Sequence, residues 1–172
     1  MGLRPTSDRL RETLFNILTA GNPAALEGTT WLDLYAGTGA VGIEALSRGA
    51  KMAYFVESSL KATALIQANL QSLQINSSFE IIKMDIVKAL QRLEAQARPN
   101  FIFLDPPYHM HKAYRQTLEL LARSQLLLAT STVIAEHDRK FEPGDTFDRL
   151  HRYRKLEQGD AALSFYRLNG CE

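Results

Sequence analysis

The sequence contains a single cysteine, Cys171, next to its last residue. One thiol rules out an internal disulfide framework and a multi-cysteine zinc site, and this usage is typical of a reducing cytosol. No apolar run approaches the roughly 18 to 20 residues that span a bilayer, and the first residues lack the apolar core of a signal peptide. We therefore expect a soluble cytoplasmic protein with no membrane partner.

Neither sign of charge is in surplus. The sequence has twenty Lys and Arg and nineteen Asp and Glu residues, which gives a formal net charge of +1. This balance excludes a uniformly basic surface for coating nucleic acid. Any polyanion must then be bound by a local basic patch. Ten glycines and six prolines are few for a chain of 172 residues, of which 45% are apolar and 23% charged. These values predict one globular domain over residues 1–172, with the leading segment 1–22 as part of it.

Strands and helices alternate along most of the chain, after a helix that Thr6 or Ser7 is expected to cap and that ends near residues 21–23. Strands are expected at 31–35, 53–56, 79–83, 101–104 and 132–136, and helices at 40–47, 60–73, 86–97 and 113–128. Because the strands are apolar without period-two alternation, they predict an α/β fold whose parallel sheet has helices on both faces. The runs 147–156 and 162–168, joined by a turn with Gly159, predict a C-terminal antiparallel hairpin and seven strands in all.

The segment from Asp33 to Gly42 places glycines where the first strand of the sheet turns into its first crossover helix. Gly37 and Gly39 let the backbone approach a ligand closely, and the start of the helix supplies oriented N–H groups. Glu57 ends the second strand about 20 residues later, where an acid can accept hydrogen bonds from both ribose hydroxyls. The pattern predicts an adenosine cofactor, and a structural glycine turn is the alternative.

Asp33 favours S-adenosylmethionine over a dinucleotide. A carboxylate beside the loop repels a pyrophosphate but attracts the ammonium of an amino acid, directly or through water. Asp85, after the third strand, is suited to accept a hydrogen bond from the adenine amine, or alternatively to cap the next helix. A nicotinamide oxidoreductase is the rival for this site. The expected cofactor-binding residues are Asp33, Tyr35, Ala36, Gly37, Thr38, Gly39, Glu57, Asp85 and Ile86.

The segment Asp105-Pro106-Pro107-Tyr108 directly follows the apolar fourth strand. The prolines have fixed φ and no amide donors, so carbonyls and the Asp105 carboxylate present acceptors at one spot while Tyr108 offers a ring face. An exocyclic base amine needs acceptors for its two N–H groups to become nucleophilic, and an aromatic ring can stack a flipped base. These four residues are the candidate catalytic set, and an acidic turn stiffened by prolines is the alternative.

Basic side chains cluster at both ends of the sequence. Arg4, Arg9 and Arg11 lie near the start, and Arg152 and Arg154 flank an aromatic residue near the end. Each cluster predicts a nucleic-acid contact or an ordinary solvated face. No metal is expected, because the acids are dispersed and the histidines lack ligand spacing.

Three segments together resemble the bacterial RsmD family. They are Arg4-Pro-Thr-Ser-Asp-Arg-Leu-Arg-Glu-Thr-Leu-Phe-Asn16, the Leu32–Gly42 loop continued to Ala50, and Leu104-Asp-Pro-Pro-Tyr108; the end of the chain, 159–166, resembles the family's last hairpin. The R-P-T opening is the most specific of these, whereas many methyltransferases share the other two. Family members usually carry a further basic segment before R-P-T, whereas this sequence starts almost at that motif. We expect either that the sequence was cut or begins late relative to the family or that the protein binds RNA more weakly.

The resemblance implies a class I, Rossmann-like methyltransferase fold and transfer of a methyl group from S-adenosylmethionine to the exocyclic N2 of a guanine in 16S ribosomal RNA. By position it implies cofactor contacts at Asp33, Gly37, Gly39, Glu57 and Asp85, binding of the target amine at Asp105, Pro106 and Tyr108, and RNA contacts at Thr6 and Arg11. The expected partner is this RNA or the small-subunit particle, with no obligatory protein partner. The alternatives are an adenine-N6 DNA methyltransferase and a non-catalytic nucleic-acid-binding relative.

Overall fold

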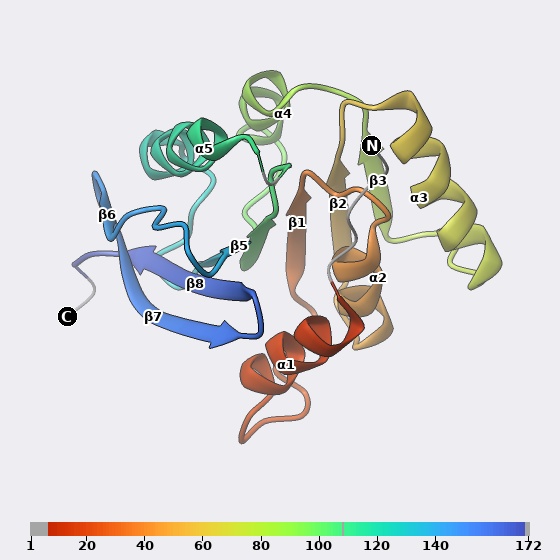
Figure 1. Cartoon of the computed structure of the whole chain (residues 1–172). Coiled ribbons are helices and arrows are strands. Elements are labelled where there is room, and N and C mark those ends of the chain that lie inside the picture. Colours follow the sequence, from red (N-terminus) through yellow and green to blue (C-terminus); the bar gives the residue numbers. More distant parts are fainter. Residues whose placement is uncertain (1–6, 108, 171–172) are drawn as a thin grey trace.

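A computed structural model describes residues 7–107 and 109–170, and Figure 1 gives its elements. The helices are α1 (Asp8–Leu18), α2 (Ala40–Ser47), α3 (Leu60–Ser72), α4 (Ile86–Leu93) and α5 (His111–Arg123). The strands are β1 (Thr30–Leu34), β2 (Met52–Val56), β3 (Phe79–Ile82), β4 (Phe101–Leu104), β5 (Thr132–Asp138), β6 (Thr146–Phe147), β7 (Leu150–Gln158) and β8 (Ala161–Leu168).

All eight strands form one sheet in the order β3-β2-β1-β4-β5-β8-β7-β6. The first five strands in this order are parallel, and β8, β7 and β6 pair antiparallel. Leu34, the last residue of β1, pairs with Val56 on one side and with Leu104 on the other. The order of the strands reverses between β1 and β4, and ligands of such sheets bind at the carboxyl ends of the strands at this reversal.

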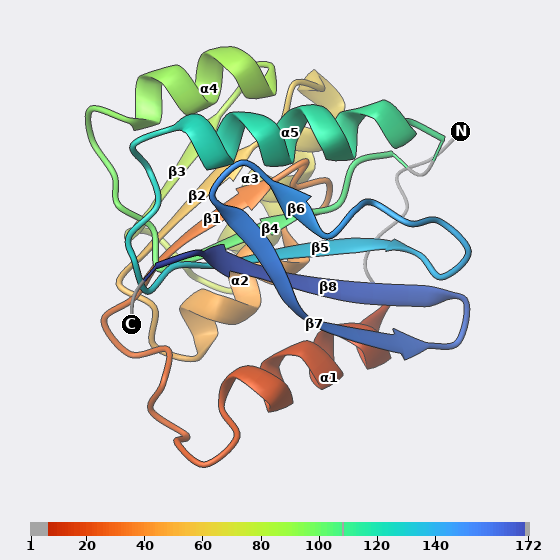
Figure 2. The ribbon, with the colours of Figure 1, turned by 90° about the vertical axis from the view of Figure 1, so that its left-hand side faces the viewer.

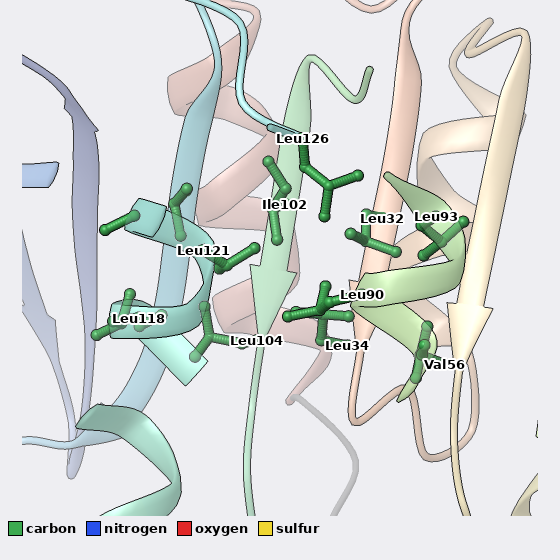
Figure 3. Close-up of a cluster of buried hydrophobic side chains, with 14 of the residues drawn as sticks. Leu32, Leu34, Val56, Leu90, Leu93, Ile102, Leu104, Leu118, Leu121 and Leu126 are labelled. Atoms are coloured by element: carbon green, nitrogen blue, oxygen red, sulfur yellow. The ribbon is translucent and has the colours of Figure 1, made fainter. Parts of the chain in front are cut away.

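Helices cover both faces of the sheet: α4 and α5 lie on one face, and α1 and α2 lie on the other (Figure 2). The helix α3 packs Ile66 and Leu70 into the same core as α1 and α2. Alternate residues of β4 belong to opposite cores, since Ile102 and Leu104 pack towards α4 and α5 while Phe103 packs towards α1 and α2. Figure 3 shows Leu118 and Leu121 of α5 close to Ile102 and Leu104. Strands buried on both faces explain why their sequences are apolar throughout.

Side-chain caps start three of the helices. The Ser7 hydroxyl accepts a hydrogen bond from Leu10 N–H at 3.2 Å, which confirms the expected start of α1. Ser59 caps α3 in the same way, and Asp85 caps α4 by accepting from Lys88 N–H at 2.9 Å. Each cap satisfies a backbone N–H that has no partner inside the helix.

The structure differs from the sequence-based expectation in the number of strands and in the bounds of several helices. The helix α1 ends at Leu18 instead of near 21–23, and α5 begins at His111 instead of 113. Residues 7–107 and 109–170 form eight strands instead of seven, because Asp148 has φ 52° and divides the run 147–156 between the short strand β6 and the long strand β7. The helix α5 ends at Arg123 instead of 128, since Ser124 is extended and its hydroxyl donates to Leu121 O at 2.8 Å. The helix α4 ends at Leu93 instead of 97. The parallel sheet with a terminal hairpin is confirmed.

The leading helix is tied to the far end of the hairpin. The Thr13 hydroxyl donates to Gln158 Oε1 at 2.8 Å, and the two residues are 145 positions apart in the sequence. Gln158 ends β7, so α1 packs where β7 turns into β8, as Figure 2 also shows. No helix within residues 7–107 and 109–170 is both long and apolar enough to cross a membrane.

Candidate active site

The glycine loop joins β1 to α2 through a backbone that is left-handed at alternate residues. Tyr35 has φ 55°, Gly37 has φ 58° and Gly39 has φ 78°. Gly39 N–H donates to Ala36 O at 2.8 Å, which closes the loop just before the helix. At Gly42, a Cβ would lie 2.5 Å from the Phe55 ring, so the first turn of α2 can approach β2 this closely only with glycine there. The loop brings the N-terminus of α2 to the carboxyl edge of the sheet.

Two carboxylates brace this loop from different sides. Gly37 N–H donates to Glu57 Oε2 at 3.1 Å, and the other oxygen of Glu57 accepts from Ser59 N–H at 3.2 Å. Gly42 N–H donates to Asp33 Oδ2 at 3.1 Å from within the core, where Asp33 is 2% exposed. Burial, the largest cause, raises the pKa of Asp33 to about 8; the Gly42 N–H lowers it and the Glu57 carboxylate raises it. Asp33 therefore lies beneath the loop, and Glu57 lies beside it.

A cavity of about 500 Å³ opens at the carboxyl ends of β2 and β3, between the start of α4 and α5; Tyr35 lines it, whereas Asp33, Ala36, Gly37, Thr38 and Gly39 do not. Its volume is within the range of sites for small molecules and cofactors. Four of the residues expected to bind the cofactor line it, namely Tyr35, Glu57, Asp85 and Ile86. Asp85 caps α4, which confirms that alternative for this residue, and it also lines the cavity. Val56, Met84 and Leu120 are among the lining residues and supply apolar surface for a flat ring.

Two polar residues that sequence reasoning missed hold the loop and the cavity wall. Asn69 of α3 donates from Nδ2 to Thr38 O at 2.9 Å, so it fixes the outer side of the glycine loop. Thr117 of α5 is fully buried and shares a hydrogen bond of 2.9 Å with the Tyr35 hydroxyl. Their only signal in the sequence is a polar residue on the packed side of a helix.

The Asp-Pro-Pro segment begins directly after β4. Because Leu104 pairs with Leu34, Asp105 and Tyr35 follow at the same level on neighbouring strands, which lie about 4.8 Å apart. Asp105 is half-buried, Pro106 is buried and Pro107 is exposed. The Pro107 carbonyl accepts from Met110 N–H at 2.8 Å, so it serves the turn into α5. The fourth member of the candidate set, Tyr108, lies outside the described residues.

The start of α5 is held by an aromatic contact. The His111 ring stacks on Phe141 at a centroid distance of 4.1 Å and an interplanar angle of 12°. Tyr114, one turn further along α5, donates its hydroxyl to Glu136 O at 2.7 Å. These contacts fix the segment that follows the prolines against the end of β5. Among the described residues, no group of three or more His, Cys, Asp or Glu side chains is arranged to hold a metal ion.

A family described as Conserved hypothetical protein 95 matches residues 1–167. A putative rRNA methyltransferase of Bacillus subtilis is 35% identical over 97% of this chain and 89% of its own length. The ribosomal RNA small subunit methyltransferase D of Haemophilus influenzae is also 35% identical, over 80% of this chain and 69% of its own. The chain belongs to the RsmD family.

Two solved structures are similar in fold to this RsmD-family chain. A putative methylase from Haemophilus influenzae is 30% identical, with a TM-score of 0.77, and the match covers 95% of this chain and 99% of that one. An RNA methyltransferase from Salinibacter ruber, in complex with S-adenosyl-L-homocysteine, is 13% identical, with a TM-score of 0.68 over 96% and 94% of the chains. The chain has the fold of S-adenosylmethionine-dependent methyltransferases, as expected.

The basic residues expected to contact nucleic acid have different surroundings in this RsmD-family chain. Arg9 is exposed on α1, and Arg11 pairs with Asp8 at 3.1 Å. The guanidinium of Arg152 lies 2.8 Å from Glu142 and 2.6 Å from Asp145, and the side chain is 11% exposed. Arg154 instead lies over the Phe165 ring, 5.9 Å from its centroid. Arg4 and Thr6 lie outside the described residues.

Proposed function

We propose that this protein transfers a methyl group from S-adenosylmethionine to the exocyclic N2 of a guanine in the ribosomal RNA of the small subunit. The observation that carries the proposal is the placement of Asp105 and Pro106 beside the glycine loop, at the reversal of the strand order. The names of the relatives support ribosomal RNA as the substrate. An enzyme with this substrate would work in the cytoplasm, where ribosomal subunits are assembled.

The residues present fit this cofactor. The cavity offers Glu57 for the ribose hydroxyls, Asp85 and Ile86 for the adenine, and apolar walls for its ring. Both oxygens of Glu57 already accept one backbone N–H, but each carboxylate oxygen has a second lone pair for a hydroxyl donor. Asp33, under the first turn of α2, is the carboxyl proposed to meet the amino-acid ammonium, whose positive charge would favour the ionised form of Asp33 when the cofactor is bound. When bound, S-adenosylmethionine supplies a methyl group on a sulfonium centre.

The chain's own residues prepare the target amine. The lone pair of an exocyclic amine is delocalised into the base, and hydrogen bonds accepted from its two N–H groups localise it on nitrogen. Asp105 and the Pro106 carbonyl are the acceptors, and Tyr108 is proposed to stack the base. The nitrogen lone pair would form the new N–C bond as the S–CH3 bond breaks and its electron pair stays on sulfur, which leaves S-adenosylhomocysteine. The nitrogen would then lose one proton to Asp105 or to water. A flipped base held in this way would present its amine to the methyl group of the bound cofactor.

The RNA is proposed to be bound by the basic residues at the two ends of the chain. Arg9 and Arg11 on α1 and Arg154 on β7 are the described candidates, together with Arg4 and Thr6. Arg152 contributes less to this surface, since Glu142 and Asp145 neutralise it. Residues 1–172 are proposed to act as one domain without an obligatory protein partner.

The test uses small-subunit particles from a strain that lacks the corresponding methyltransferase, incubated with labelled S-adenosylmethionine. The wild type should produce N2-methylguanosine in the RNA of these particles. Asp105→Ala should lower turnover by at least about 10²–10³-fold, the cost of losing one such polar contact to the reacting group. Its dissociation constant for S-adenosylhomocysteine should stay within twofold of wild type, because Asp105 is not among the residues that line the cavity.

Glu57→Ala is the matched variant on the cofactor side. It should weaken the binding of S-adenosylhomocysteine, since it removes both the ribose acceptor and the bond to Gly37 N–H. Normal turnover by Asp105→Ala would show that Asp105 is not the acceptor for the target amine. Labelled N6-methyladenine in DNA, with no label in ribosomal RNA, would show that the rival substrate is the true one.

A further inference from the structure

A second cleft, of about 710 Å³, lies at the opposite edge of the sheet from Asp105. The start of β5, the start of β7 and the end of β8 form it, and Figure 2 shows the end of β8 on the left and the loop that follows β4 on the right. Polar and basic side chains line this cleft, among them Thr130, Thr132, His151, Tyr153, Arg167 and Asn169. No Asp or Glu of the described residues is among its lining residues.

Aromatic rings of the hairpin hold two arginines in this region. The Arg167 guanidinium lies 4.5 Å from the centroid of the Tyr153 ring, and Tyr153 is 42% exposed. An irregularity in the register between Arg152 and Arg154 turns Tyr153 to the same face of the hairpin as Phe165, whose ring is 6.2 Å away. Arg154 lies over the Phe165 ring. The rings hold both guanidinium groups in place, and a fixed guanidinium loses less freedom when it binds an anion.

Three other cations in or near the hairpin pair with carboxylates, while Arg149, just before β7, donates to Ala122 O. Arg152 pairs with Glu142 and Asp145, Lys155 with Glu142 and Glu157, and Arg139 with Glu157. Arg167 and Arg154, by contrast, have no carboxylate within ion-pair distance in the described part of the chain. Their charge is available to an anion outside the protein, and an arginine binds phosphate through two parallel hydrogen bonds.

We propose that Arg167 and Arg154 bind backbone phosphates of the RNA, so that the hairpin forms a second RNA contact remote from the reacting base. This rests on the proposed function, which supplies an RNA long enough to reach both places. Phe101 of β4 pairs with Thr132 at the start of β5, so Asp105 lies four residues further along the strand direction than Thr132. This separation is about 13 Å. Two inter-strand spacings, about 10 Å, separate β4 from β8, which carries Arg167, and three, about 14 Å, separate β4 from β7, which carries Arg154. A single nucleotide held at Asp105 does not reach Arg167, whereas a folded RNA does.

The test compares Arg167→Gln, Arg154→Gln and the double variant with Arg123→Gln, which removes an exposed charge from α5 on the other face of the sheet. The probes are unmethylated small-subunit RNA and a labelled single-stranded RNA of about 12 nucleotides. Each of the two hairpin variants should weaken RNA binding by about 3- to 10-fold and reduce the slope of log K against log salt by about 0.7–0.9. KM for the RNA should rise with kcat unchanged, and the affinity for S-adenosylhomocysteine should not change.

Tyr153 acts as a positioning residue and has its own pair of variants. Tyr153→Leu should weaken RNA binding by releasing Arg167, whereas Tyr153→Phe, which keeps the ring, should bind as wild type does. Because all these side chains are partly or fully exposed, the variants should melt at the wild-type temperature. Arg167→Lys, which keeps the charge but not the two-pronged geometry, should fall between wild type and Arg167→Gln.

Specific outcomes overturn this proposal. If the double variant and Arg123→Gln have equal RNA affinity and equal salt slope, the hairpin does not contact the RNA, even if the wild type methylates it. Adenosine monophosphate that binds as tightly as the RNA, and loses its binding in Arg167→Gln, would make the cleft a small-molecule site. If the wild type methylates no RNA but binds it through Arg167, the proposed function fails and the hairpin contact stands.

Discussion

At the scale of single residues, Asp33 is a carboxyl that the fold keeps away from water. Its carboxyl is buried under the first turn of α2, and its pKa is raised from 3.8 to about 8. The folded protein therefore keeps a proton there that the unfolded chain gives up above about pH 4. Because the unfolded state binds fewer protons, this group makes the free energy of unfolding fall as pH rises from about 4 to about 8.

We expect Asp33→Asn to remove this dependence. Asparagine keeps an oxygen that can accept from Gly42 N–H, and it has no proton to lose. The slope that Asp33 contributes approaches about −1.4 kcal/mol per pH unit at most, and it should be absent from the variant in urea unfolding measured from pH 5 to 8. A wild type and a variant with parallel profiles over this range would show that Asp33 is ionised in the folded protein.

At the scale of elements, the glycine loop depends on a helix that is distant in the sequence. We expect Asn69→Ala in α3 to weaken the binding of S-adenosylhomocysteine by about 2- to 12-fold, the equivalent of one hydrogen bond of about 0.5–1.5 kcal/mol. Turnover at saturating cofactor should be almost unchanged, because Asn69 touches only the Thr38 carbonyl of the loop. Isothermal titration calorimetry measures the change.

Gln67→Ala is the control for this variant, since Gln67 is exposed on the same helix. Asn69→Asp is the more stringent variant because it keeps the size but removes the donor. It should lose at least as much affinity as Asn69→Ala, and wild-type affinity in Asn69→Asp would exclude the role of the Thr38 contact.

The sequence predicted those elements whose cause is local. Ser7 caps α1, the glycines at 37 and 39 turn β1 into α2, and the alternation of helices and strands gives the parallel sheet. The sequence did not predict elements that are very short or contacts that join distant residues. The strand β6 has two residues, too few for a pattern, and the partners of Thr38 and Tyr35 come from helices 31 and 82 positions away. Contacts between residues so far apart in the sequence are determined only by the packed fold.

At the scale of the whole molecule, the two cores share one sheet, and this predicts a single unfolding transition. Leu118 of α5 is fully buried against the strands. Leu118→Ala should lower the free energy of unfolding by about 2–5 kcal/mol, the cost of a cavity in a packed core. The same strands carry the core on the other face, so both faces should unfold together in urea, with one midpoint by fluorescence and by circular dichroism.

Leu60→Ala is the matched control, since this leucine of α3 is 68% exposed. It should change the free energy of unfolding by no more than about 0.5 kcal/mol. Two separate midpoints in Leu118→Ala would mean that the helices α4 and α5 can detach while the rest of the sheet stays folded.

The two outermost strands, β6 and β3, have only two and four residues. An outer strand offers unpaired N–H and C=O groups on which another chain can add a strand, and the extent of such growth depends on the length of that row. On β3, Glu80 is engaged by Arg92, and Ser78 just before the strand has φ 70°, which bends the backbone out of the extended form. Neither margin is therefore a good template for fibril-like growth, and the protein is protected against self-association through its sheet at both ends.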